Sequence, residues 1–156
     1  MSIEPLSAER DAEACDVIVR SLPYHFGIEE GRVACAAAVR AQSGLVARAN
    51  DGLVVGFLTV AEHFDHSAEV TWMAVHAAHR HHGIGRALVV HLSERLRQEG
   101  RRVLIAFTVS SSDPGPEPDD GYQVTRAFYR GVGFVEARDI PELWPGDTAV
   151  LMVLAL

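Results

Sequence analysis

The chain has 156 residues, a formal net charge of -7 and 48% apolar residues. That length matches about one domain, and the apolar fraction excludes an intrinsically disordered chain. The acidic balance disfavours a general nucleic-acid binder, because phosphate neutralisation requires a basic face, and it would attract a cationic substrate. We therefore expect a single domain over residues 1–156.

The N-terminus and the cysteines indicate the compartment. The first residues contain neither a basic stretch nor an apolar core of a signal peptide, and no apolar run reaches about 18 residues. Cys15 and Cys35 fall in predicted amphipathic helices, where a free cysteine behaves as a small buried hydrophobe. A disulfide between them is the less favoured alternative. These features predict a soluble, cytoplasmic protein.

The first half of the chain predicts one strand, two helices and a hairpin. Ser7 is the expected N-cap of the first helix, Pro23 ends that helix, and Asp51-Gly52 indicates an antiparallel hairpin. The expected elements are a strand at Ile3–Leu6, a helix with Ala14, Ile18 and Leu22 on one side, a helix at Glu29–Ala41, and strands at Leu45–Ala49 and Leu53–Ala61.

The second half predicts alternating strands and helices. Residues 110–121 are rich in Pro, Gly and Asp and predict a mobile surface loop. The expected elements are a strand at Glu69–Val75, a long helix with Ile84, Leu88, Leu92 and Leu96 as its buried stripe and Gly100 as its end, a strand at Val103–Thr108, a helix at Val124–Arg130, and a closing antiparallel pair at Phe134–Ala137 and Ala149–Leu154.

The turn between the strand that ends at Val75 and the long helix has the pattern of a phosphate cradle. Its sequence, Arg-His-His-Gly-Ile-Gly-Arg, carries glycines at positions 83 and 85. Backbone N–H groups at a helix start lack intrahelical acceptors, and glycine lets the backbone approach an anion closely. The pattern lacks the Gly-Lys-Ser/Thr of a nucleoside triphosphate loop and the third glycine of a dinucleotide fingerprint. An Arg-x-x-Gly-x-Gly loop remains.

Two segments carry a family resemblance. The segment AEVTWMAVHAAHRHHGIGRALVVHL resembles the acyl-coenzyme A binding core of the GNAT superfamily of N-acetyltransferases, whose signature is Gln/Arg-x-x-Gly-x-Gly/Ala after a strand. The segment TRAFYRGVGFVEA, residues 125–137, resembles the later helix and strand of that family. The resemblance implies an α/β fold of the α+β kind, with a mixed, mostly antiparallel sheet of six to seven strands flanked by about four helices.

The resemblance also implies a site for acetyl-CoA as co-substrate, without a metal. In the family the strands before and after the cradle helix splay apart, and the pantetheine arm lies in the gap. Many members carry Asn seven residues before the later tyrosine, and here Tyr122 stands in that place. The implied coenzyme-binding residues are Met73, Ala74, Val75, Arg80, His81, His82, Gly83, Ile84, Gly85, Arg86 and Tyr122.

Acetyl transfer to an amine requires a base for the amine and an acid for the departing thiolate. Glu69 is the expected base, because it sits in a half-buried strand, on the face of Thr71 and Met73 by alternation, and resembles the family's catalytic glutamate. The alternative is a carboxylate at an edge or strand start that only faces water. Tyr129 is the expected acid, and the alternative is a core aromatic, the role we expect for Phe128.

Six of the histidines lie close to these segments. His76, His79, His81 and His82 fall within seven residues, but strand end, loop and helix start cannot easily direct all four inward, so we expect no metal. Partly protonated imidazoles would instead add positive charge beside a pyrophosphate. The remaining two, just before Glu69, are alternative bases acting through water: His63 and His66.

The acceptor side is less specified by the sequence. The resemblance places the acceptor over the loop between the first two helices and the last hairpin, which makes Tyr24, His25, Phe26 and Trp144 the expected walls. Acidic residues that would suit a small cationic amine are Glu29, Glu30, Asp119 and Asp120. The alternative is that these aromatic residues pack on each other.

The resulting functional prediction is an N-acetyltransferase that moves an acetyl group from acetyl-CoA to a primary amine of a small molecule or peptide. Attack is expected to be direct, in a ternary complex, because no cysteine lies in either motif. The alternative is a non-catalytic acyl-CoA-binding sensor or partner module. A homodimer is a further expectation from the resemblance.

Overall fold

The computed structural model describes residues 1–112 and 121–156. Within these ranges the element order is β1 (Ser2–Pro5), α1 (Ala8–Arg20), α2 (Glu29–Ala41), β2 (Ser43–Arg48), β3 (Val54–Glu62), β4 (Ser67–Val75), a 3-10 turn η1 (Ala77–His79), α3 (Ile84–Gln98), β5 (Val103–Val109), α4 (Gln123–Gly131), β6 (Val135–Trp144) and β7 (Asp147–Ala155). This order and the mixed sheet confirm the predicted fold class.

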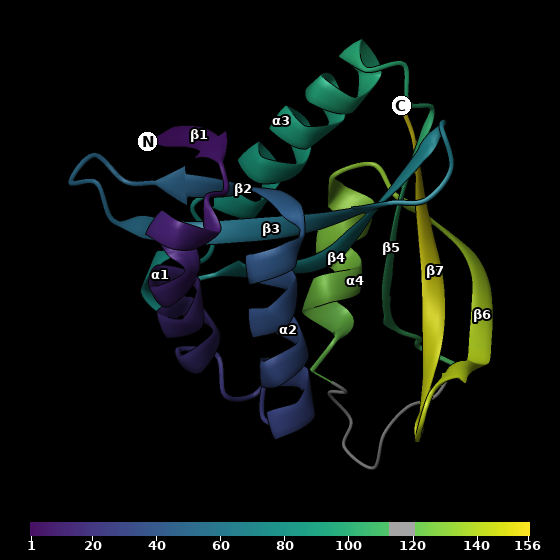
Figure 1. Ribbon diagram of the computed structural model, residues 1–156. Coiled ribbons are helices and arrows are strands. Elements are labelled where there is room, and N and C mark those ends of the chain that lie inside the picture. Colours follow the sequence, from purple (N-terminus) through teal and green to yellow (C-terminus); the bar gives the residue numbers. More distant parts are fainter. Residues whose placement is uncertain (113–120) are drawn as a thin grey trace.

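The strands form one sheet in the order β1-β2-β3-β4-β5-β7-β6. The β4–β5 pair is parallel, and the other described pairs are antiparallel. The hairpin predicted at Asp51-Gly52 is confirmed, with Gly52 at φ 87° in the turn between β2 and β3. Figure 1 shows α1 and α2 in front of the sheet and α3 and α4 behind it. The crossover through α3 is what permits the parallel β4–β5 pair.

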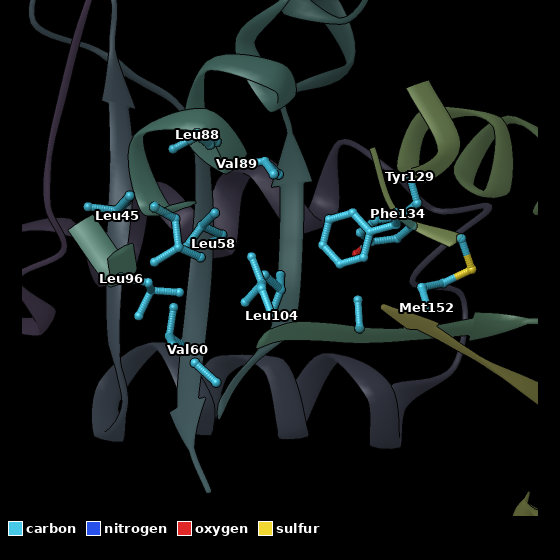
Figure 2. Packing of buried hydrophobic residues seen from close by; sticks show 14 of the residues in the cluster. Leu45, Leu58, Val60, Leu88, Val89, Leu96, Leu104, Tyr129, Phe134 and Met152 are labelled. Atoms are coloured by element: carbon cyan, nitrogen blue, oxygen red, sulfur yellow. The ribbon is translucent and has the colours of Figure 1, made fainter. Parts of the chain in front are cut away.

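The larger core lies between α3, α4 and the sheet. The apolar stripe predicted for the long helix is confirmed, because Leu88 and Leu92 are fully buried and Ile84 and Leu96 nearly so. Figure 2 shows the α3 side chains directed at the sheet, and the Tyr129 ring beside Phe134. Tyr129 and Phe134 stack edge to face with ring centroids 5.1 Å apart. This contact joins the end of α4 to the core under α3.

The second core lies between α1, α2 and the opposite sheet face. Cys15 and Cys35 are fully buried in it as free thiols, as predicted. Burial raises the pKa of both thiols to about 12. A thiol protonated at every ordinary pH is a poor nucleophile, so these cysteines serve packing.

A buried carboxylate ties α1 to the first two strands. The Asp11 side chain is 0% exposed and accepts hydrogen bonds from the Ser7 N–H at 3.0 Å and from the guanidinium groups of Arg10 and Arg48. Ser7 does occupy the N-cap position, but its hydroxyl makes no capping bond. The helix start is therefore held by Asp11 rather than by the predicted serine cap.

Two predicted boundaries are wrong. The helix α1 ends at Arg20, so Leu22 packs in the core from the following turn. Strand β6 runs from Val135 to Trp144 instead of ending at Ala137. It is an exposed edge strand, where charged residues and Pro141 are tolerated because one side needs no partner. Because nearly all of its residues are exposed, the sequence pattern did not reveal the full length of β6.

The loop predicted at residues 110–121 lies mostly outside the described residues. Strand β5 ends at Val109, so the loop begins at Ser110 as predicted, although Ser110 is buried and its hydroxyl donates to Asp139 on β6 at 2.7 Å. Among the described helices, none has the length and apolar character needed to cross a membrane.

Candidate active site

Strands β4 and β5 part at the centre of the sheet. Their pairing runs from Ser67 opposite Val103 to Val70 opposite Ala106, while β4 continues to Val75 and β5 to Val109. Beyond Val70, the described β4 has backbone groups on its β5 side without strand partners. Unpaired strand backbone is a template for another extended chain. The His76 N–H donates to Val55 on β3, so by alternation the Ala74 backbone also faces β3, and the opening offers the main-chain groups of Met73 and Val75 to a linear ligand.

A bulge in β4 lies at the point where the strands part. Thr59 pairs with Trp72 and Val60 with Val70, so Thr71 is an extra residue in β4. The Thr71 hydroxyl donates to the Gln42 side chain at 2.5 Å, on the face of α2. A bulge shifts the alternation by one residue. The prediction that Glu69, Thr71 and Met73 share one face is therefore wrong for Met73, which packs in the core with α3.

The turn after β4 carries a run of unpaired backbone donors. None of the N–H groups from His81 to Arg86 donates to an acceptor among the described residues. Gly83 adopts φ 77° as the N-cap of α3, and His81 adopts φ 64°. A left-handed non-glycine residue is strained and is typical of ligand-binding turns. Helix start, open N–H groups and strain together describe an anion site.

Two residues of this turn also contact α4. A Cβ added to Gly85 would lie 3.1 Å from the Phe128 ring, so glycine favours the close contact of α3 with α4. The Arg86 side chain donates from Nη1 to the Gly131 carbonyl at 2.9 Å. Its guanidinium therefore binds the end of α4, and only its backbone N–H belongs to the cradle.

The turn is fixed in place by α1 and β3. The Ala77 N–H donates to the Ser21 hydroxyl at 3.1 Å, and the His76 N–H donates to the Val55 carbonyl at 2.9 Å. Ser21 follows α1 directly and was not singled out from the sequence, since no local pattern connects it to a turn 56 residues away. Its hydroxyl links the first helix to the cradle.

The histidines near the cradle do not converge. His76 Nδ1 accepts from the Ala78 N–H at 3.2 Å, and its ring meets that of His79 edge to face at 5.7 Å. A ring nitrogen that accepts a backbone hydrogen bond has no lone pair left for a metal. Within residues 1–112 and 121–156, no group of three His, Cys, Asp or Glu residues is arranged to hold a metal ion.

Glu69 lies in the middle of the sheet, directly before the strands part. Its Cα partners are Ala61 on β3 and Ile105 on β5, so β4 is not an edge strand. Its side chain is 19% exposed, and one carboxylate oxygen lies 2.6 Å from His63 Nε2. Glu69 is thus half-buried and already hydrogen-bonded, unlike the alternative of a carboxylate in open water.

Tyr129 lies on the inner face of α4. Burial, and then the charge of Glu69, raises the pKa of its phenol well above the usual value of about 10. The residue is 6% exposed, and its hydroxyl is not among the buried polar atoms that lack a partner, so the hydroxyl reaches solvent at the site. Because the charge of Glu69 raises the pKa of Tyr129, the two predicted catalytic groups lie close enough to interact electrostatically.

The family model described as acetyltransferase (GNAT) domain matches residues 40–136, which include β4, the cradle, Glu69 and Tyr129. The chain belongs to the GNAT family. Membership supports acetyl-CoA-dependent acetyl transfer as the general chemistry of such a domain. A comparison with curated protein sequences gives no match.

Solved structures share the GNAT fold over the whole chain. A GNAT-family protein from Desulfovibrio desulfuricans has a TM-score of 0.81 and 22% identity, covering 99% of this chain and 98% of its own. The ribosomal-protein-alanine N-acetyltransferase of Escherichia coli has a TM-score of 0.75 and 22% identity, with 99% and 92% covered. A GNAT acetyltransferase from Elizabethkingia anophelis, with acetyl-CoA bound, has 0.74 and 15%, with 99% and 97% covered.

The GNAT domain carries an aromatic cluster beside the cradle. The His25 ring lies 5.7 Å from that of Tyr24 and 6.1 Å from that of Tyr122, the N-cap of α4. Burial, then the charges of Asp147 and Tyr24, raises the pKa of Tyr122. Burial, then the charge of Arg80, lowers the pKa of His25. The cluster thus joins the α1–α2 loop to α4, near the cradle and the β6–β7 turn.

The other predicted walls are placed differently. Phe26 packs in the core of α1 and α2, with its ring 5.9 Å from Trp72, so it supports the loop rather than lining an open site. Trp144 ends β6 and pairs with Asp147 across the turn. Glu29 forms an ion pair with Arg32 on α2, and the predicted Asp119 and Asp120 lie outside the described residues.

Arg126 is a residue of this GNAT site that the sequence analysis missed. It is 5% exposed and donates from Nη1 to the Val109 carbonyl at 2.9 Å, at the end of β5 where that strand has left β4. The signal was present, because a residue three positions before Tyr129 shares its helix face. A buried arginine rarely occurs without such partners, so Arg126 holds α4 against the open strand.

Proposed function

We propose that this chain transfers an acetyl group from acetyl-CoA to a primary amine of a small molecule or peptide by direct attack in a ternary complex. The observation that carries the proposal is the continuity of the opening beyond Val70 with the unpaired N–H groups from His81 to Arg86. An extended arm joined to a pyrophosphate needs such a channel that ends in an anion cradle. The proposal treats residues 1–156 as one domain.

The cradle would bind the pyrophosphate and the open edge of β4 the pantetheine arm. Main-chain N–H groups in the opening would also stabilise the oxyanion that forms when the amine attacks the thioester carbonyl. Glu69 would take a proton from the incoming ammonium group, which leaves the nitrogen lone pair free to attack. The tetrahedral oxyanion would then collapse and break the carbon–sulfur bond, while the new amide nitrogen releases its extra proton to solvent. The Tyr129 phenol would donate a hydrogen bond to the departing thiolate.

The raised pKa of Tyr129 bears on this step. The phenol stays protonated throughout the neutral range, which a donor requires. Full proton transfer to a thiolate is less favourable from a raised pKa than from an ordinary one, because an aliphatic thiol has a pKa of about 8.5. Tyr129 is therefore proposed to stabilise the thiolate chiefly through a hydrogen bond.

The acceptor side rests on the aromatic cluster and Asp147. Aromatic faces and a nearby carboxylate attract cations, so the cluster of Tyr24, His25 and Tyr122 would receive the ammonium end of the acceptor. This part of the proposal covers small amines and peptide N-termini alike. A homodimer in the cytoplasm is also a proposal, and sedimentation velocity at micromolar concentration that shows only monomer would end the dimer.

Thiol release from acetyl-CoA, measured against a panel of amino acids, polyamines, aminoglycosides and short peptides, tests the activity. We expect amine-stimulated release with a product heavier by one acetyl group. Release that no amine stimulates, together with calorimetric binding of acetyl-CoA, would instead favour the non-catalytic binding module. Absence of any acetyl-CoA binding would contradict both.

A matched pair of variants tests the cradle. Gly83→Asp and Gly83→Asn place side chains of nearly equal size at φ 77°, a conformation that both residues tolerate better than most. They differ in one negative charge. We expect acetyl-CoA to bind the Asp variant at least ~10-fold more weakly than the Asn variant, a difference of about 1.4 kcal/mol. Equal affinities would show that no anion lies against this turn.

A further inference from the structure

The turn between β3 and β4 presents a histidine to the proposed base. His63 follows β3 directly, and its Nε2 lies 2.6 Å from Glu69 Oε2. The histidine side chain is 42% exposed, whereas that of Glu69 is 19% exposed. The short contact therefore occupies one carboxylate oxygen of Glu69, while solvent still reaches the imidazole ring of His63.

The turn that carries His63 is held by its own hydrogen bonds. The His63 N–H donates to the Ser67 carbonyl at 3.4 Å, and the Phe64 N–H donates to the Ser67 hydroxyl at 3.3 Å. From outside the turn, Arg101 donates to the Phe64 carbonyl at 2.9 Å and pairs with Glu62 at 2.5 Å. These contacts fix the backbone of His63, so its ring approaches Glu69 from a defined direction.

We propose that His63 is a positioning residue that acts through Glu69. A neutral imidazole with its proton on Nε2 donates to Oε2, which leaves Oε1 of the carboxylate to accept the proton of the amine. Glutamate has three side-chain torsions and loses much conformational freedom when ordered. The histidine orders the carboxylate before substrate arrives, in the manner of a base that a third group orients. This inference rests on the proposed function of Glu69.

The choice of donor atom follows from the partners. A carboxylate only accepts hydrogen bonds, so the ring nitrogen that faces it must carry a hydrogen. Nδ1 of His63 has no hydrogen bond to a described residue and can remain unprotonated toward solvent. The arrangement therefore requires a hydrogen on Nε2, and the protonation of that nitrogen is observable without any turnover.

The kinetic test compares His63→Gln with His63→Ala. The glutamine amide can place a donor near the position of Nε2, whereas alanine removes it. We expect His63→Ala to lower kcat by about 10- to 100-fold, the usual range for removing an orienting partner, with little change in the KM of acetyl-CoA. His63→Gln should retain kcat within a few-fold of the unaltered protein. His91→Ala, at an exposed position on α3, is the control and should change neither constant.

Each kinetic outcome bears on the proposal. An unchanged kcat in His63→Ala would overturn it, as would equal losses in the Gln and Ala variants, which would show that the ring itself transfers the proton. If the unaltered protein is active and Glu69→Gln is equally active, the role of Glu69 is overturned, and with it the role of His63. If the unaltered protein shows no activity toward any amine, the proposed function itself is contradicted.

A spectroscopic readout separates the contact from the activity. Imidazole nitrogen resonances report which ring nitrogen carries the proton, whether or not turnover occurs. We expect His63 to show the Nε2-protonated tautomer at pH 8 and to lose that preference in Glu69→Gln. A tautomer protonated on Nδ1, or no response to Glu69→Gln, would overturn the positioning role even in an active enzyme.

Discussion

Replacing Tyr129 by Phe should lower the activity and leave the stability nearly unchanged. The substitution removes one hydroxyl and leaves the ring, which packs against Phe134 at 5.1 Å between centroids. That hydroxyl has no hydrogen bond to a described residue. The hydroxyl is not among the buried polar atoms that lack a partner, so it reaches solvent and its deletion costs little. The free energy of unfolding should therefore change by less than about 1 kcal/mol.

The loss of rate follows from the proposed role in the departure of the thiolate. General acid groups contribute about 10²- to 10⁴-fold to a rate. The raised pKa of Tyr129 favours hydrogen bonding over full transfer, so we expect the low end, about 100-fold in kcat or about 2.7 kcal/mol. The affinity for acetyl-CoA should change little, because the cradle and the β4 edge are untouched.

The assays are thiol release at saturating substrates, urea unfolding and calorimetry with acetyl-CoA. Because the folded pKa is raised, the unfolded chain loses this proton first. Any stability that the phenol contributes is complete below about pH 10 and falls at higher pH, and the Phe variant should lack that fall. Unchanged kcat would refute the acid role. A loss of stability above about 1 kcal/mol would refute the unpaired hydroxyl.

Three further predictions concern the rest of the molecule. Asp11→Asn should destabilise the fold by about 1–3 kcal/mol in urea unfolding, because it weakens hydrogen bonds to charged groups. Burial raises the pKa of Asp11, but its hydrogen bonds outweigh burial and lower it, so this stability is present above about pH 4 and is lost as pH falls. Gly121→Ala should raise the acceptor KM, because its Cβ would lie 2.0 Å from the Tyr24 ring, while Gly52→Ala, equally strained at φ 87° without contacts, should not. Cys15 and Cys35 should react with a thiol reagent only after unfolding, and reaction in the native state would contradict their burial.

Some features of the site could be predicted because they are local. The cradle follows from glycines at fixed offsets between a strand and a helix, and Gly83 does adopt the positive φ that this turn requires. The long helix follows from its apolar stripe. The edge strand β6 could not be delimited, because a strand that is exposed along its length has no alternation to detect.

Other features depended on contacts between distant segments. Thr71 is a bulge because β3 and β4 change register there, which alternation within β4 does not reveal. The Ser21 hydroxyl, which follows α1, accepts a hydrogen bond from the cradle turn, and the Arg86 guanidinium donates to the end of α4. Phe26 packs in the core between α1, α2 and the sheet. In each case the side chain type allowed both roles, and the neighbour from a remote element decided between them.

The sequence by itself determined the order of the elements and the place of the glycine-bearing turn, and its resemblance to known motifs indicated the GNAT family. Element order and turn depend on hydrophobic periodicity and on glycine at fixed spacing, which act over a few residues. Only the tertiary structure decided that β4 and β5 part after Val70, that His63 contacts Glu69, and that Tyr129 responds to the charge of Glu69. Pairing register, burial and electrostatic fields arise when distant segments pack, so no local pattern contains them.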